Sequence, residues 1–281
     1  YEEMLRMEQK MDYEIIRKIE REYSTPFYAF SVDEFIANYK ELVNCYRDYY
    51  ENFQIAYSFK TNYMPFACKQ IKNLGGYAEV VSDMEYEMAL KYGFDPQKII
   101  VNGPGKWNGL KTMLQNGSIV MLDNSYELEK TIEIAASLNN QVFVGFRLNF
   151  LLENKKVSRF GFDAESQETL EWIELARKSK NITIVGIHFH LGGSRSIDDW
   201  KVRVDKMIYY AEKYLHDEEK RIIDLGSGMF GHLSPELAQQ FGQKIPSFSE
   251  YAEKVAGSFN AFYSQKDYKP LLVVEPGATL I

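Results

Sequence analysis

The chain has only two cysteines, Cys45 and Cys68, among its 281 residues. They form neither a disulfide framework nor a metal-binding spacing, so a reducing compartment, the cytoplasm, is expected. The sequence also lacks basic blocks, and its formal net charge is −7. This balance argues against binding to nucleic acid or to an anionic membrane surface. No apolar run approaches the length needed to cross a membrane, and the first residues are charged rather than signal-like.

Length and composition predict one large domain. Hydrophobic residues make up 45% of the chain and aromatic residues 15%, which is enough to bury a single barrel-sized core. The chain begins with Tyr1 rather than methionine and ends on the apolar residues Leu280 and Ile281. These ends suggest an excerpt of a longer protein.

Regularly spaced apolar runs predict the strands. They cover residues 54–59, 77–81, 98–102, 118–122, 142–148, 182–189, 221–225 and 271–275. Helix-like stretches lie between them, at residues 64–74, 83–92, 125–138, 165–179 and 198–215. Eight strands alternating with helices predict a parallel α/β sheet, and at this length closure into a (β/α)8 TIM barrel is the natural solution. A doubly wound open sheet is the alternative, because periodicity does not show closure.

A different segment precedes this pattern. Residues 1–23 carry apolar side chains at roughly helical spacing, and residues 26–30 predict a short strand. Ser31 then caps a helix that extends to about residue 50. We expect residues 1–30 to form an N-terminal helix and strand, and residues 31–281 to form the barrel.

Parallel α/β folds bind ligands at the carboxyl ends of their strands, so the residues at those ends are the candidates for function. Every predicted strand end except the third and fourth carries polar residues or a glycine turn. These residues are Lys60, Glu79, Ser82, Arg147, His188, His190, Gly192, Gly193, Ser194, Gly226, Ser227, Gly228, Glu275 and Gly277.

Lys60 stands at the end of an apolar, aromatic-rich strand. Lysine is rarely buried without a partner or a function, because removing its charge from water is costly. Where its pKa can fall, the amine is suited to forming a Schiff base with an aldehyde cofactor or a carbonyl substrate. The alternative is a lysine that simply leaves the strand for solvent.

His188 and His190 lie on one face of their strand, because side chains alternate along it. The pair is compatible with metal binding, but a metal would need further ligands on neighbouring strand ends. The other two histidines, His216 and His232, are at none of them, so we expect no metal. One imidazole could instead stack on an aromatic cofactor, or be a hydrogen-bonded core histidine.

Three glycine turns follow neighbouring strands, at residues 192–194, 226–228 and 276–277. Backbone N–H groups in such turns can point at an anion, although an ordinary tight turn has the same sequence. None has the spacing of a dinucleotide fingerprint or of a nucleotide-binding loop, which favours a single small phosphate.

Glu275 ends the last strand, across the barrel mouth from Lys60. It is either a salt-bridge partner or a carboxylate that keeps a ring nitrogen protonated. A protonated pyridine ring is what pyridoxal phosphate needs to withdraw electrons. A Schiff-base lysine, a stacking histidine, a phosphate cradle and this carboxylate together predict one site for that cofactor.

The chain resembles the barrel-type (alanine-racemase-like, fold type III) enzymes that use pyridoxal phosphate, and among them the diaminopimelate, ornithine and arginine decarboxylases. The resemblance extends from about residue 25 to residue 281. The motif sequences at residues 79–82 and 188–190 are most similar to those of the diaminopimelate branch. It is carried by residues 57–62 (Tyr-Ser-Phe-Lys-Thr-Asn), 78–82 (Ala-Glu-Val-Val-Ser) with Glu85, 158–161 (Ser-Arg-Phe-Gly), 188–192 (His-Phe-His-Leu-Gly) and 275–277 (Glu-Pro-Gly).

The resemblance implies a role for each residue. Lys60 forms the Schiff base with pyridoxal 5′-phosphate, His190 stacks on the ring, and Glu275 pairs with the ring nitrogen. The phosphate is lined by Gly226, Ser227, Gly228 and Gly277, and Ser194 is a further candidate there. Arg147 and Glu79 orient these groups. The implied reaction is decarboxylation of a small (di)amino acid through a quinonoid intermediate, in a homodimer with shared active sites.

The sequence departs from the family at several positions. Ala278 replaces the arginine that usually follows Glu-Pro-Gly, Gly193 replaces a serine, and Ser227 replaces the middle glycine of a triplet. The missing arginine weakens diaminopimelate as the substrate more than it weakens the cofactor assignment. The family also adds a C-terminal β-domain, on which residues 1–30 would pack, and this sequence ends before it.

Other functions stay open from the sequence alone. A racemase on the same fold is the first alternative, but simple alanine racemases tend to place an arginine at the pyridine nitrogen, where this chain has Glu275. A non-catalytic carrier of the cofactor is the second, although that group lacks the Glu-Pro-Gly ending. A metal-dependent hydrolase is the most remote.

Overall fold

Eight strands form a closed parallel barrel in the computed structural model, which describes residues 13–106, 108–152 and 158–281. The barrel strands are β1 (Phe53–Ser58), β2 (Tyr77–Val80), β3 (Ile99–Val101), β4 (Ile119–Leu122), β5 (Val142–Asn149), β7 (Ile182–His188), β8 (Ile222–Asp224) and β9 (Leu271–Val274). Closure follows from two pairings: β1 pairs with β9, and β4 pairs with β5. The TIM barrel prediction is therefore confirmed, and the open-sheet alternative is wrong. A short strand β6 (Phe162–Asp163) pairs with the end of β5.

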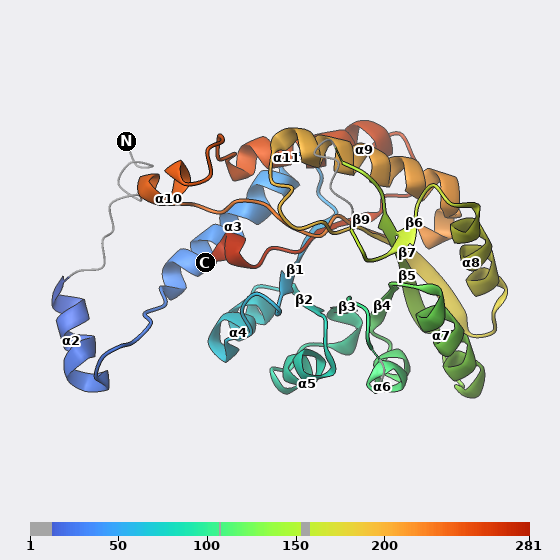
Figure 1. Cartoon of the computed structure of the whole chain (residues 1–281), viewed down its shortest axis with the longest axis horizontal. Coiled ribbons are helices and arrows are strands. Elements are labelled where there is room, and N and C mark those ends of the chain that lie inside the picture. Colours follow the sequence, from blue (N-terminus) through green and yellow to red (C-terminus); the bar gives the residue numbers. More distant parts are fainter. Residues whose placement is uncertain (1–12, 107, 153–157) are drawn as a thin grey trace.

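Helices surround the strands (Figure 1). They are α3 (Val32–Arg47), α4 (Pro65–Asn73), α5 (Asp83–Lys91), α6 (Leu110–Gln115), α7 (Ser125–Ser137), α8 (Gln167–Lys178), α9 (Ile197–Tyr214), α10 (Pro235–Gln239) and α11 (Phe248–Tyr263). Short 3-10 turns occur at Pro96–Lys98, Asp217–Glu219 and Ala278–Leu280. The sequence pattern predicted α3 to α5 and α7 to α9 but not α6, α10 or α11.

Polar caps fix where helices begin after the strands. Ser82, Asn124 and Ser196 each accept a hydrogen bond from a backbone N–H in the first turn of α5, α7 and α9. Such caps satisfy N–H groups that have no partner within the helix. Ser82 therefore stabilises the start of α5, and the chain reverses within a few residues of the ends of β2 and β4.

Alternation along the strands separates two apolar layers. Residues such as Ile55 and Tyr57 point outward and pack against the helices. A second cluster contains strand residues only and fills the barrel interior: Ala56, Ile100, Ile119, Met121, Val185, Ile222 and Val273. Two residues further along several strands, the interior changes from apolar to polar, and the site begins there.

The N-terminal segment differs from the prediction in part. Helix α2 (Tyr13–Tyr23) is present but has no buried residue, and it stands apart from the barrel in Figure 1. No strand forms at residues 26–30, so that prediction is wrong; Tyr28 is fully exposed and no neighbouring strand pairs with the segment. Residues 1–12 lie outside the described part, and the division at residue 30 stays a prediction.

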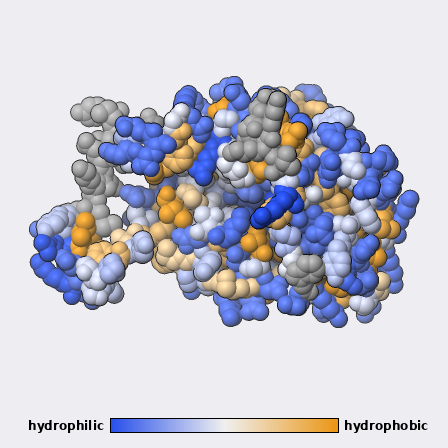
Figure 2. All heavy atoms as spheres, viewed as in Figure 1, coloured by the Kyte–Doolittle hydropathy of each residue, from blue (hydrophilic) through white to orange (hydrophobic). Residues whose placement is uncertain are grey.

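The surface is mostly hydrophilic, with small scattered apolar patches on the face shown in Figure 2. Among the described residues, no helix is both long and apolar enough to span a membrane.

Two glycines give a matched test of the packing. A Cβ on Gly186 of β7 would lie 1.9 Å from the backbone oxygen of Ile222, whereas one on Gly257 of α11 would meet only Tyr49 Cδ1, at 3.7 Å. We expect Gly186→Ala to lower the free energy of unfolding by about 3 kcal/mol through overpacking. Gly257→Ala should raise it by roughly 0.5–1 kcal/mol, because alanine favours the helix. Urea unfolding of both variants measures this, and equal effects would contradict the packing described here.

Candidate active site

A ring of buried polar side chains lies at the carboxyl end of the barrel. Each barrel strand contributes one of them, within two residues of its last residue. The ring consists of Ser58, Glu79, Asn102, Asp123, Arg147, His188, Asp224 and Glu275. Asn102 and Asp123 follow β3 and β4, so the expectation that these two strand ends carry no polar group is wrong. Because buried polar groups need partners, the contacts within this ring determine its chemistry.

Lys60 is held by Glu79. Its Nζ lies 2.8 Å and 2.9 Å from the two carboxylate oxygens, and Ser58 donates a further hydrogen bond to Glu79. The Lys60 side chain is 35% exposed, at the barrel mouth. Burial alone would lower the pKa of Lys60, but the charges of Glu79 and Glu275 and the hydrogen bond to Glu79 raise it above its ordinary value. Glu79 therefore stabilises the ammonium form of Lys60.

Asn102 joins the two carboxylates of the ring that flank the mouth. Its Nδ2 donates to Glu79 Oε1 at 3.2 Å and, through a shorter contact, to Glu275 Oε1. A neutral amide can donate to two carboxylates without adding charge, and it does not titrate. Asn102 therefore fixes the positions of Glu79 and Glu275 relative to each other.

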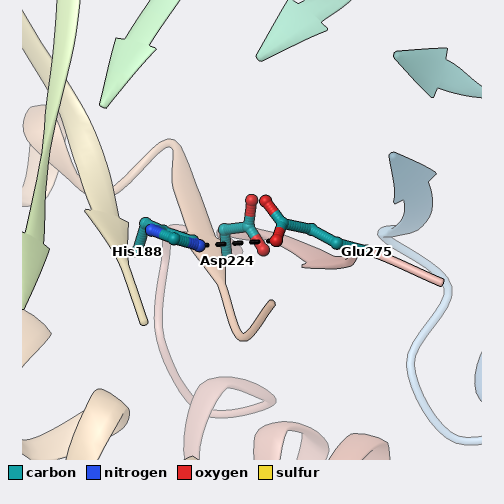
Figure 3. Close-up of side chains that lie close together, drawn as sticks. All are labelled: His188, Asp224 and Glu275. Carbon is teal, nitrogen blue, oxygen red and sulfur yellow. Dashed lines mark ion pairs between the residues drawn. The ribbon is translucent and has the colours of Figure 1, made fainter. Parts of the chain in front are cut away.

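Glu275 meets His188 and Asp224 on its other side (Figure 3). His188 Nε2 lies 3.5 Å from Glu275 Oε2, and one donor atom from each of the three residues lies within 4.8 Å of the others. Burial raises the pKa of Asp224 well above its usual range, and the charge of Glu275 raises it further. Burial would also raise the pKa of Glu275, but His188 and Lys60 lower it overall. The two shifts are in opposite directions, so Asp224 takes up a proton more readily than Glu275.

The same three residues bear on the question of a metal. The further ligands on neighbouring strand ends are carboxylates rather than histidines, since Asp224 and Glu275 offer oxygens beside His188. His216 and His232 lie elsewhere, next to Glu218 and Glu41. The expected absence of a metal stays a prediction.

Arg147 links the ring to the loop that carries His190. It donates to Asp123 Oδ1 at 3.4 Å and to the backbone oxygen of His190 at 3.2 Å. Behind it, Lys106 Nζ lies 2.8 Å from Glu127 Oε2, in a second buried amine–carboxylate pair. Burial lowers the pKa of Lys106. The sequence analysis did not single out Lys106, because it lies in the turn after β3.

His190 is positioned by the glycine turn after β8. Its Nδ1 accepts a hydrogen bond from the Ser227 N–H at 3.2 Å, which leaves Nε2 to carry the ring proton. Burial lowers the pKa of His190 well below its usual value, and the charge of Lys60 lowers it further, so the ring is neutral. A Cβ on Gly226, whose φ is +62°, would lie 2.8 Å from His190 Cβ, and only glycine fits there.

The glycine turns lie around the same mouth. Around Gly192 a Cβ would meet nothing within 4 Å, whereas Gly277 packs tightly against the Thr61 side chain. The Gly228 N–H donates to no group in the described part of the chain. The structure thus brings the residues predicted from six strand ends to one end of the barrel, where Ser82 caps α5.

This arrangement is that of a (β/α)8 barrel whose polar centre lies at the carboxyl ends of its strands, with an amine after β1 and a carboxylate after the neighbouring β9. The chain belongs to the pyridoxal-dependent decarboxylases. The family described as "Pyridoxal-dependent decarboxylase, pyridoxal binding domain" matches residues 34–281. Membership confirms the resemblance predicted from the sequence, and with it pyridoxal phosphate as the cofactor.

Individual relatives agree with this family. The chain is 26% identical over 279 residues to the diaminopimelate decarboxylase of Aquifex aeolicus, covering 95% of this chain and 62% of that protein. It is 32% identical over 184 residues to the Helicobacter pylori J99 enzyme, covering 60% of this chain and 44% of the relative. The chain therefore spans less than two thirds of these curated relatives.

Solved structures show the same fold. Diaminopimelate decarboxylase of Methanocaldococcus jannaschii superimposes with a TM-score of 0.82 at 24% identity, covering 94% of this chain and 63% of that one. Lysine decarboxylase of Selenomonas ruminantium gives 0.77 at 20% identity, covering 96% and 67%.

The residues at the mouth fit pyridoxal phosphate. Glu275 Oε2 is buried and has no hydrogen-bond partner among the described residues, as a carboxylate awaiting a protonated ring nitrogen would be. Lys60 offers an accessible amine, and the free Gly228 N–H offers a donor for phosphate. When bound, the cofactor supplies an electron-withdrawing ring.

The raised pKa of Asp224 leads to a prediction about how the stability of the fold depends on pH. A raised folded-state pKa means that its contribution to stability is fully present below about pH 4 and is lost as the pH rises through that pKa. Asp224→Asn keeps a neutral side chain of similar shape and removes this titration. We expect its free energy of unfolding to fall less than that of the wild type between about pH 5 and pH 8, by about 1 kcal/mol or more.

Urea unfolding across this pH range measures the difference. Asp205→Asn, on the exposed face of α9, is the control and should follow the wild type. Identical profiles for Asp224→Asn and the wild type would show that Asp224 is ionised in the folded state.

Proposed function

We propose that this chain is the cofactor-binding barrel of an amino-acid decarboxylase that uses pyridoxal phosphate and acts on a diamino acid, as diaminopimelate decarboxylase does. The observation that carries the proposal is the buried carboxylate of Glu275, at the end of the strand next to the one that leads to Lys60. A carboxylate at this position keeps the cofactor ring protonated and so favours loss of the α-carboxylate. The relatives, which are diaminopimelate decarboxylases, support this choice of reaction.

Each residue of the site has a proposed part. Lys60 attaches the cofactor through its aldehyde, and Glu79, bonded to Nζ, is the group placed to take up the proton that the amine must release. His190, neutral and fixed by Ser227, offers a flat face to the ring. Arg147 positions the His190 loop through its backbone oxygen. The phosphate is assigned to Ser194, Gly226, Ser227, Gly228 and Gly277.

The substrate assignment rests on the relatives' chemistry. The Helicobacter pylori enzyme was solved in complex with L-lysine, and the relatives at this level of similarity act on diamino acids by name. Ala278 leaves no cation directly after Pro276 and Gly277, where the family usually has arginine. We therefore propose that the substrate is a diamino acid. The missing arginine makes diaminopimelate itself a weaker candidate within that class.

Two further assignments belong to this proposal. A homodimer with shared active sites and a cytoplasmic location are carried over from the family. A racemase is disfavoured because Glu275, not arginine, stands at the proposed ring-nitrogen position. A non-catalytic carrier is disfavoured by the match to a decarboxylase family.

Release of carbon dioxide tests the proposed reaction. Supplied with pyridoxal phosphate, the protein should release labelled carbon dioxide from at least one carboxyl-labelled diamino acid. Lys60→Ala should reduce this release by roughly a thousandfold, because the covalent attachment is lost. Lys201→Ala, on the exposed face of α9, is the control and should retain full release.

The alternatives give different results in the same assay. Inversion at the α-carbon without release of carbon dioxide, followed by chiral chromatography, would contradict the proposal and favour a racemase. Bound cofactor with neither reaction on the whole panel would favour a carrier.

A further inference from the structure

Arg203 of α9 is a fully buried arginine behind the barrel mouth. Its guanidinium stacks on Trp200, with Cζ 4.1 Å from the ring centroid, and Phe189 lies on another side at 5.4 Å. Buried arginines are rare and normally have several acceptors, because the charge is costly to remove from water. The proposed reaction gives Arg203 no role, so its burial has to be explained by the groups that it contacts.

All the hydrogen bonds described for Arg203 go to backbone oxygens of two loops. Nη1 donates to the backbone oxygens of Leu225 and Ser227, each at 3.0 Å, and Nη2 donates to the backbone oxygen of Ser194 at 3.3 Å. Leu225 and Ser227 belong to the turn after β8, and Ser194 belongs to the turn after β7. One rigid side chain thus ties together the two loops assigned to the phosphate.

These bonds orient the peptide groups on the other side of the loops. In a trans peptide the carbonyl and the following N–H point in opposite directions. The Ser227 carbonyl and the Gly228 N–H belong to one peptide group. Because Arg203 donates to the Ser227 oxygen, the Gly228 N–H points away from Arg203. Within the described residues this N–H has no acceptor, whereas the Ser227 N–H is already used by His190. The Gly228 N–H is left for a ligand.

Arg203 also brings charge to this place. Burial lowers its pKa to about 10, while the charge of Asp199 acts in the opposite direction, so the guanidinium stays protonated at neutral pH. A cation bonded to carbonyl oxygens polarises the peptides and makes their N–H groups better donors. Lysine could not replace it, since its ammonium lacks the planar fork that reaches three acceptors while stacking on a ring.

We propose that Arg203 is a positioning residue for the cofactor phosphate: it holds the turns after β7 and β8 in the shape that binds the phosphate and touches no cofactor atom itself. The location of the phosphate rests on the proposed function. Arg203 thus determines the geometry of the glycine turns from outside them, on helix α9.

Comparison of two ligands tests this role. Pyridoxal phosphate and pyridoxal both have the aldehyde and the ring, but only the first has the phosphate. Their affinities for the protein follow from titrations monitored by cofactor absorbance. We expect Arg203→Met to weaken pyridoxal phosphate by roughly tenfold, the equivalent of one charge-assisted hydrogen bond, and pyridoxal by less than about twofold. Arg203→Lys should lie between the wild type and Arg203→Met.

Arg177→Met is the matched control. Arg177 is also largely buried, but it bonds Glu219 and the backbone oxygen of Tyr214, before β8, at the opposite end of the barrel. Its loss should lower the thermal midpoint without changing the ratio of the two affinities. If Arg203→Met does not fold, the ratio measured for Arg203→Lys decides.

Two results would overturn the inference: equal weakening of both ligands, or an unchanged ratio in folded Arg203 variants. Failure of the wild type to bind either ligand would instead contradict the proposed function. Inorganic phosphate gives an independent reading, since it should compete with pyridoxal phosphate less effectively in the variants than in the wild type.

Discussion

Pairing of buried carboxylates with donors from other strands is the constraint on which this structure depends. Carboxylates from β2, β4 and β9 are removed from water at one end of the barrel, and each meets a donor from another strand. Closure of the barrel adds a contact between residues far apart in sequence, since Asn102 and Glu275 are 173 positions apart. Asn102 shows the principle most clearly, since one uncharged amide fixes two carboxylates. Breaking one partnership would leave a buried charge uncompensated.

The same constraint gives the site its asymmetry. The pKa of Lys60 is raised by Glu79 despite burial, whereas burial raises the pKa of Asp224 and the pKa of Glu275 is lowered. Between them, the His190 ring is neutral and fixed by a backbone N–H. An aldehyde cofactor with a basic ring nitrogen and a phosphate needs these three environments in one pocket. The electrostatics of the ring, rather than any one residue, therefore determine which cofactor the barrel can use.

Local periodicity predicted much of this arrangement, and long-range contacts account for what it missed. Buried strands leave short apolar runs, so the barrel strands could be predicted from the sequence alone. The aromatic run at residues 26–30 looks the same, but no strand pairs with it. In the sequence, Asn102 looks like an ordinary turn residue after a strand, and Arg203 looks like an exposed arginine of an amphipathic helix. Their burial follows only from closure of the barrel and from the loops packed against α9.

Covalent trapping of the cofactor tests the central claim most directly. Two amines near the barrel mouth compete as attachment points: Lys60, whose side chain is 35% exposed, and Lys106, which is buried with Glu127. Borohydride reduction of the protein with pyridoxal phosphate, followed by peptide mass spectrometry, identifies the modified amine. The account predicts a pyridoxyl group on Lys60 and none on Lys106. A group on Lys106 or on a surface lysine, or no modification of the folded protein, would contradict it.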